Sequence, residues 1–299
     1  MNPLPGIRLP RPSPTVSRLY LLLGAAFWSM GGYFIKEIDA GALSITFFRC
    51  LFAALWLLPF VPGRKFPKPL DMAVSVVLFA LLLGLYVAST KETTAANAIF
   101  LQYTAPVYVI ILGPWLLGEA LRRSDAIPLV ICLGGIAVLF ADNQGSGDAK
   151  GLWMGAGSGL FYGLFLIWLR RLRYADPIAV TFANCAGVAL LLAPVPGNWH
   201  VDAPNAGLLA LMGGVQFALP YVLFTTGLRD ISGVEASLIA LIEPVLNPLW
   251  VALLLGEEPT IATVIGGAAI IAGLALRYAV LRPRDAGLAA EAEELAEPT

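Results

Sequence analysis

The sequence predicts an all-α integral membrane protein, because it is far too apolar for a soluble domain. Of its 299 residues, 58% are hydrophobic and only 13% are charged, and the mean hydropathy is +0.78. A soluble chain of this length needs more charge to cover its surface. Apolar runs long enough to cross about 30 Å of hydrocarbon as helices of about 20 residues recur along the chain. They do not alternate polar with apolar residues, as the strands of a membrane barrel do.

Ten such runs are separated by short loops that contain proline, glycine and charged residues. We predict transmembrane helices near residues 19–36, 42–61, 71–90, 94–117, 125–141, 151–169, 177–195, 205–227, 233–255 and 260–281. The proline-rich and basic residues 1–18 are predicted to form a disordered cytoplasmic arm. The acidic residues 282–299 are predicted to form a loose cytoplasmic tail.

The distribution of lysine and arginine predicts the orientation of these helices. The cation-poor loops hold only Lys36, Lys91 and Lys150. The opposite set of loops holds Arg8, Arg11, Arg18, Arg64, Lys65, Lys68, Arg122, Arg123, Arg170, Arg171, Arg173, Arg229, Arg277, Arg282 and Arg284. This second set is predicted to be cytoplasmic. Both termini are then inside, which requires an even number of spans.

An internal repeat divides the chain into two halves. A shift of 138 residues aligns residues 91–123 with residues 229–261 without a gap, so that Pro106 falls on Pro244. Because each half contains five predicted spans, the second half must enter the membrane from the opposite side. The sequence therefore predicts inverted repeats at 19–141 and 151–281, an arrangement typical of transporters with a substrate site near the bilayer midplane.

The second half contains the most specific stretch of the sequence. SGVEASLIALIEPVLNPLWVALLLGEEPT, followed by GGAAIIAGLAL, resembles the last two spans of the EamA-type exporters of the drug/metabolite transporter superfamily. The first half departs from that pattern, with Ala105-Pro106 in place of Glu243-Pro244. The resemblance implies ten helices, a bacterial inner-membrane location and export of small metabolites, often amino acids. Within the superfamily, the general similarity is to the aromatic amino acid exporter branch.

Glu243 is the candidate site residue that lies deepest in a predicted span. Pro244 and Pro248 are expected to kink this helix, and Pro106 to kink its counterpart, because proline removes a backbone hydrogen bond. Asn247 lies one turn from Glu243 on the same face, which should point into protein or water. The carboxyl could donate a hydrogen bond to a neighbouring helix, bind a substrate amine, or carry a coupled proton.

Further candidates are polar or aromatic side chains on other spans. Arg49 is either a structural arginine or the partner of a substrate carboxylate. Asn97 and Leu101 share one face of the fourth span, where interhelical packing and cavity lining remain open alternatives. Aromatic rings could stack on an apolar substrate or simply fill the core. These candidates are Trp28, Tyr86, Tyr103, Tyr162, Trp168 and Tyr221.

These features favour a secondary transporter that works by alternating access, moving amphipathic metabolites such as amino acids outward across the lipid bilayer. A drug or nucleotide-sugar carrier of the same fold is the alternative. An intramembrane enzyme is less favoured, because no span carries a nucleophile and base at workable spacing. We expect a monomer with no metal, no cofactor, no nucleic-acid partner and no ATP hydrolysis, since His200 is the only histidine and no Walker A motif appears.

Overall fold

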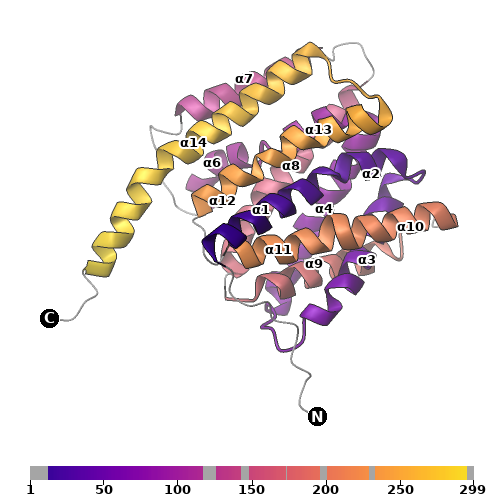
Figure 1. The fold of residues 1–299 in the computed structure, drawn as a ribbon, viewed down its shortest axis with the longest axis horizontal. Coiled ribbons are helices and arrows are strands. Elements are labelled where there is room, and N and C mark those ends of the chain that lie inside the picture. Colours follow the sequence, from indigo (N-terminus) through magenta and orange to yellow (C-terminus); the bar gives the residue numbers. More distant parts are fainter. Residues whose placement is uncertain are drawn as a thin grey trace.

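The computed structural model describes residues 13–116, 126–142, 148–172, 174–195, 201–228 and 233–294, and the regular elements within these ranges are all helical (Figure 1). Most of the predicted arm, residues 1–12, lies outside them, as do residues 295–299. The helices are α1 (Pro14–Ser29), α2 (Gly31–Glu37), α3 (Ala42–Leu57), η1 (Leu58–Phe60), α4 (Pro69–Glu92), α5 (Ala95–Gln102), α6 (Ala105–Leu116), α7 (Ala126–Asp142), α8 (Ala149–Leu169), η3 (Arg170–Leu172), α9 (Pro177–Leu192), α10 (Ala203–Leu211), the π-helix η4 (Met212–Ala218), α11 (Leu219–Gly227), α12 (Gly233–Ala240), α13 (Ile242–Leu255) and α14 (Ile261–Glu294).

Seven helical stretches among the described residues are long and apolar enough to cross a membrane. They are Ala42–Phe60, Pro69–Glu92, Ala95–Leu116, Ala149–Leu172, Ala203–Gly227, Glu235–Leu255 and Ile261–Tyr278. Two apolar helices, Ala126–Asp142 and Pro177–Leu192, are shorter. At the N-terminus α1 has 16 residues and α2 has 7, and a turn at Met30 separates them. The protein is therefore an all-helical, multi-pass membrane protein.

The first and last helices extend beyond the predicted spans. Helix α1 begins at Pro14, where the Ser13 hydroxyl accepts a hydrogen bond from the Val16 amide, and proline favours the first helical position. Helix α14 continues to Glu294, past the predicted end of the last span at 281. The alanine- and glutamate-rich sequence there favours a helix over the expected loose tail. In Figure 1 this part of α14 points away from the other helices.

Three helical spans are interrupted inside the molecule. The interruptions lie at Met30, at Tyr103–Thr104 between α5 and α6, and at Leu241 between α12 and α13. Pro106 and Pro244 each follow one of them by a few residues, whereas Pro248 lies inside α13, which continues past it. A fourth span contains the π-helical segment Met212–Ala218. Such irregular backbone at membrane depth is tolerated where it is buried in protein or lines a cavity.

The helices pack in pairs that join the two halves of the chain. Helix α4 packs along α8, α1 along α11, α3 along α9 and α7 along α14. The glycines of α8 allow a close approach: a Cβ at Gly159 would lie 2.5 Å from the Leu101 carbonyl oxygen, and one at Gly163 would lie 2.8 Å from the Ala105 carbonyl oxygen. These glycines form a packing surface of α8. Helix α8 thereby holds the α5–α6 interruption in place.

Candidate functional site

The interruptions of the two proline-containing spans contact each other through Tyr103 and Glu243. The Tyr103 hydroxyl donates to the Glu243 Oε2 atom at 2.8 Å and to the Ala240 carbonyl at 3.1 Å. Pro244 has no N–H to donate to that carbonyl, so Tyr103 replaces the missing backbone bond. The hydrogen bonds thus join the break in the first half of the chain to the break in the second half.

The α1–α2 interruption is enclosed by polar side chains from three other elements. Asn247 of α13 is buried against Gly32, where a Cβ would lie 2.5 Å from the Asn247 Oδ1 atom. Its Nδ2 atom donates to the Tyr86 hydroxyl of α4 at 3.3 Å. Gln216 of η4 donates from Nε2 to the Trp28 carbonyl at 2.9 Å. Only glycine at position 32 allows Asn247 to come this close to the helix.

Arg49 of α3 is buried beside these groups and is not paired with a carboxylate. Its guanidinium lies over the Phe217 ring, 4.0 Å from the ring centroid. No carboxylate of the described residues lies within 4.0 Å of it. It interacts electrostatically with Tyr86, Tyr221 and, at longer range, Glu243. A charge at membrane depth costs about 3 kcal/mol on insertion scales, so Arg49 stays a candidate for a functional role.

Aromatic rings form a row that begins at Arg49. Trp28 contacts the rings of Tyr221 and Phe224, each at a centroid distance of 5.0 Å. Phe217 extends this row, 5.2 Å from Tyr221. Tyr162 of α8 lies close to Glu243, Tyr103 and Tyr221. The structure therefore brings most of the predicted candidates together, with Arg49 and Glu243 among an aromatic set.

Three predicted candidates lie apart from this cluster. Asn97 bonds Thr93 and accepts from the Thr263 hydroxyl at 3.0 Å, which ties α5 to α14. Leu101 is buried against Gly155 and Gly159 of α8. Trp168 donates its indole N–H to the Asp71 carbonyl at 2.9 Å. All three are occupied by contacts between helices.

Gln216 and Phe217 belong to the cluster and were missed by the sequence reasoning. Both lie in the π-helix Met212–Ala218. Single-turn π segments inside helices occur frequently at functional sites. A glutamine in the apolar run GGVQFALP was a signal that could have been used, because an amide in a membrane span needs hydrogen-bond partners.

The end of the molecule that the charge pattern assigns to the outside is closed by polar contacts. Lys36 forms a salt bridge with Glu257 at 2.7 Å and donates to the Thr93 carbonyl, also at 2.7 Å. Glu257 accepts in addition from the Ala95 amide at 2.7 Å. Lys91 donates to the Ile38 carbonyl. These bonds connect α2, α4 and α5 with the loop after α13.

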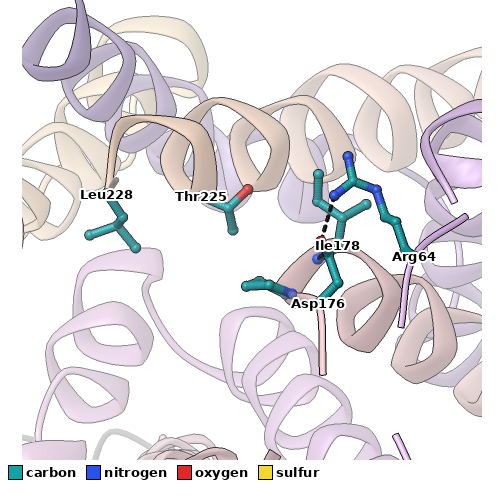
Figure 2. A pocket seen from close by; sticks show the side chains of 6 residues that line it. Arg64, Asp176, Ile178, Thr225 and Leu228 are labelled. Atoms are coloured by element: carbon teal, nitrogen blue, oxygen red, sulfur yellow. Dashed lines mark hydrogen bonds and ion pairs between the residues drawn. The ribbon is translucent and has the colours of Figure 1, made fainter. Parts of the chain in front are cut away.

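The opposite end contains a cavity of about 370 Å³ (Figure 2). Arg64 and Asp176 form a salt bridge of 2.7 Å on one side, and Thr225 and Leu228 of α11 lie across from them. Pro177 and Ile178 complete the described lining. The Thr225 hydroxyl donates to the Tyr221 carbonyl one helical turn earlier. The cavity thus begins about one turn from the aromatic row.

The arrangement is suited to binding and release rather than to covalent chemistry. Its irregular helices, buried polar groups and aromatic rings are the parts from which transporter sites are built. The EamA-like transporter family model matches residues 16–141 and matches again at residues 149–279. The chain belongs to the EamA-like transporter family. The two matches cover both halves of this EamA-like protein.

Several similar proteins are transporters by name. An uncharacterized transporter of Archaeoglobus fulgidus is 30% identical over 262 residues, which cover 86% of this chain and 94% of the relative. The uncharacterized transporter YxxF of Bacillus subtilis is 25% identical, covering 88% of this chain and 89% of that protein. Human solute carrier family 35 member G1 is 26% identical over 66% of this chain and 60% of its own length.

A solved structure with a similar fold is among those that match this chain. It superimposes with a TM-score of 0.64 and 17% sequence identity, covering 91% of this chain and 100% of that chain. At this identity the likeness concerns the fold alone. The protein is therefore a membrane transporter of the EamA-like family, and its substrate has to be argued from its own residues.

Proposed function

We propose that this EamA-like protein is a secondary transporter that exports small amphipathic metabolites, chiefly amino acids with apolar or aromatic side chains. The observation that carries the proposal is the cluster of Arg49, Glu243 and aromatic rings at helix interruptions. An unpaired guanidinium offers a partner for the carboxylate of an amino acid, buried oxygen atoms offer partners for its ammonium group, and the rings offer a surface for its side chain.

The fold that we propose for this function has ten transmembrane helices in two inverted repeats. The seven long apolar helices, the two shorter ones and the interrupted α1–α2 pair would supply the ten spans. The packing supports the symmetry, because exchanging the halves converts the α4–α8 pair into the α1–α11 pair. The two family matches support it as well.

Alternating access is supported by the difference between the two ends. The Lys36–Glu257 end is held together by hydrogen bonds, whereas a cavity is present at the Arg64–Asp176 end. With the predicted orientation, substrate would enter from the cytoplasm and leave outward without ATP. We place the protein in the inner membrane of a bacterial cell, with cytoplasmic termini, as a monomer.

Glu243 is proposed to respond to substrate or to protons. When it is ionised, the single Tyr103 hydrogen is shared between the Glu243 carboxylate and the Ala240 carbonyl. When it is protonated, the carboxyl can donate to the Tyr103 oxygen and leave the tyrosine hydrogen to Ala240. In both states the Ala240 carbonyl at the helix interruption accepts a hydrogen bond from Tyr103. The Tyr103–Glu243 pair therefore suits a carboxyl that changes protonation or binds an amine during transport.

A nucleotide-sugar substrate fits these residues less well. Its phosphates call for more than one cation at membrane depth. Among the described residues, Arg49 is the one buried lysine or arginine. A single buried guanidinium matches a monocarboxylate better.

Counterflow in proteoliposomes tests the proposal. Purified protein is reconstituted with unlabelled amino acid inside, and entry of labelled amino acids is measured beside labelled cationic drugs. We expect exchange of aromatic and branched amino acids, with Glu243→Gln slower or insensitive to pH. Exchange of a cationic drug but of no amino acid would refute the substrate class. A Glu243→Gln variant with the wild-type rate and pH profile would remove the coupling role.

A further inference from the structure

Four buried polar atoms around the α1–α2 interruption have no hydrogen-bond partner among the described residues. They are the Nε and Nη1 atoms of Arg49, Oε1 of Gln216 and Oδ1 of Asn247. The three residues are 5%, 1% and 0% exposed, respectively. Buried polar groups in native proteins are nearly always paired, so a group of unpaired ones requires an explanation.

The three side chains come from different elements and converge on one place. Gln216 Nε2 lies 3.1 Å from the Cβ position of Gly31, and Asn247 Oδ1 lies 2.5 Å from that of Gly32. Tyr86 bonds Asn247 and interacts electrostatically with Arg49. Gln216 and Asn247 therefore adjoin Gly31 and Gly32, and Arg49 is connected to them through Tyr86 and through Phe217, the residue after Gln216.

The unpaired atoms are of two opposite kinds. The two Arg49 nitrogens are cationic donors, whereas Gln216 and Asn247 present amide oxygens, which are acceptors. The orientation of the Gln216 amide is determined by its bond to the Trp28 carbonyl, which requires a donor and so leaves Oε1 as the unpaired atom. Unpaired cationic donors together with unpaired acceptors complement a ligand that carries both a negative and a positive group.

Phe217 holds the Arg49 guanidinium in position for such a ligand. Its ring covers one face of the guanidinium at 4.0 Å. A guanidinium that is stacked through its face keeps the N–H groups along its edge, in the plane where they can grip a carboxylate with two parallel bonds. The stack therefore holds the charge in position without using the donors.

We propose that Arg49 binds the carboxylate of an α-amino acid and that Gln216 Oε1 and Asn247 Oδ1 bind its ammonium group. The apolar side chain then lies against the row of Trp28, Phe217 and Tyr221. This assignment rests on the proposed function and adds to it the residues that select a zwitterion. It makes Arg49 the discriminator against amines, and Asn247 the discriminator against carboxylic acids.

Three ligands with the same phenyl group separate these roles. L-Phenylalanine carries both charges, phenethylamine lacks the carboxylate, and 3-phenylpropionate lacks the ammonium group. Binding of each is measured on purified full-length protein in nanodiscs, together with counterflow in proteoliposomes. The variants are Arg49→Gln, Arg49→Lys and Asn247→Leu. The control is Ser75→Ala, which removes another buried unpartnered oxygen, on α4 and outside the cluster.

Arg49→Gln is expected to weaken binding of L-phenylalanine and 3-phenylpropionate on the order of 100-fold and to leave binding of phenethylamine nearly unchanged. The reason is that a site built to pair a polar group loses much of its affinity when the pair is broken. Arg49→Lys should weaken binding of the same two carboxylates by an intermediate factor, since lysine keeps the positive charge but cannot form two parallel bonds to a carboxylate. Asn247→Leu should weaken L-phenylalanine and phenethylamine and spare 3-phenylpropionate. A folding defect cannot produce these reciprocal patterns.

The assignment is overturned if Arg49→Gln binds L-phenylalanine as the wild type does, or if each variant weakens all three ligands equally. If Arg49→Gln does not fold, the binding of the three ligands to Arg49→Lys and Asn247→Leu tests the assignment in the same way. Wild-type protein that exchanges no amino acid refutes the proposed substrate class together with this site. Wild-type exchange that survives in Arg49→Gln refutes this site alone.

Discussion

Breaking the Lys36–Glu257 salt bridge should open the end of the transporter that we assign to the outside. The pair is partly buried, with side chains 21% and 25% exposed and a separation of 2.7 Å. Glu257→Gln removes the charge but keeps an oxygen that can still accept from the Ala95 amide. The loss is then mainly that of one charge-assisted bond, worth about 2 kcal/mol. At about 1.4 kcal/mol per factor of ten, this shifts the equilibrium toward the open state by about 30-fold.

The assay uses a cysteine at position 98 as a reporter of opening. Ala98 is fully buried on α5, three residues beyond the Ala95 amide that binds Glu257. The three native cysteines are buried and are replaced first. A membrane-impermeant maleimide added to the predicted outer side should label Ala98→Cys up to about 30-fold faster when Glu257→Gln is present.

A second salt bridge at the same end supplies the control. Lys150 and Glu92 also join the two halves at 2.7 Å, but their side chains are 62% and 43% exposed. An exposed pair contributes about 0–1 kcal/mol, so Glu92→Gln should change the labelling rate by no more than a few-fold. Exchanging the two charges, with Lys36→Glu and Glu257→Lys together, should slow labelling again only in part, because the exchanged side chains lose the bonds to the Ala95 amide and the Thr93 carbonyl. Equal labelling in wild type and Glu257→Gln would refute the assignment of this pair as the closing contact.

Two further predictions concern the helix interruptions and the packing around them. Tyr103→Phe removes the hydrogen bonds to the Ala240 carbonyl and to Glu243. It should lower the free energy of unfolding by about 1–2 kcal/mol and alter the pH profile of counterflow. An unchanged melting temperature and pH profile would contradict the link that Tyr103 makes between the two helix interruptions. Gly159→Ala places a Cβ 2.5 Å from the Leu101 carbonyl oxygen and should cost about 1–3 kcal/mol, whereas no atom lies within 4 Å of a Cβ at Gly84, so Gly84→Ala should be neutral or stabilising. Thermal unfolding in detergent compares the two, and equal melting temperatures would show that the glycine contact does not matter.

The overall architecture and the family could be predicted because they depend on features that repeat along the chain. Long apolar runs predicted the membrane helices, and seven of them are long enough to span a membrane in the structure. The EP and GE pairs of the second half carried the resemblance that the family match confirms. These are local signals, and tertiary contacts do not alter them.

The parts that the sequence did not predict depend on contacts between distant helices. The π segment is held where Gly213 and Gly214 pack on α3: a Cβ at Gly213 would lie 2.8 Å from the Arg49 carbonyl oxygen. The local sequence does not show which carbonyl oxygen will accept the hydrogen bond of a backbone N–H in a helix. Asn97 and Leu101 both lie within α5, but this helix ends at Gln102, so Tyr103 and Thr104 do not continue the helix that the prediction assumed. Tyr103 therefore turns to Glu243, while Asn97 and Leu101 pack between helices.

Trans-stimulated efflux of labelled L-phenylalanine is the measurement that tests alternating access through this site most directly. Proteoliposomes are loaded with the labelled amino acid, and its exit is followed with and without unlabelled L-phenylalanine outside, in the absence of ATP. We predict saturable efflux that the external amino acid accelerates, because a carrier returns faster when it is loaded. Efflux that rises linearly with concentration and ignores external substrate, or no efflux at all, would contradict the account.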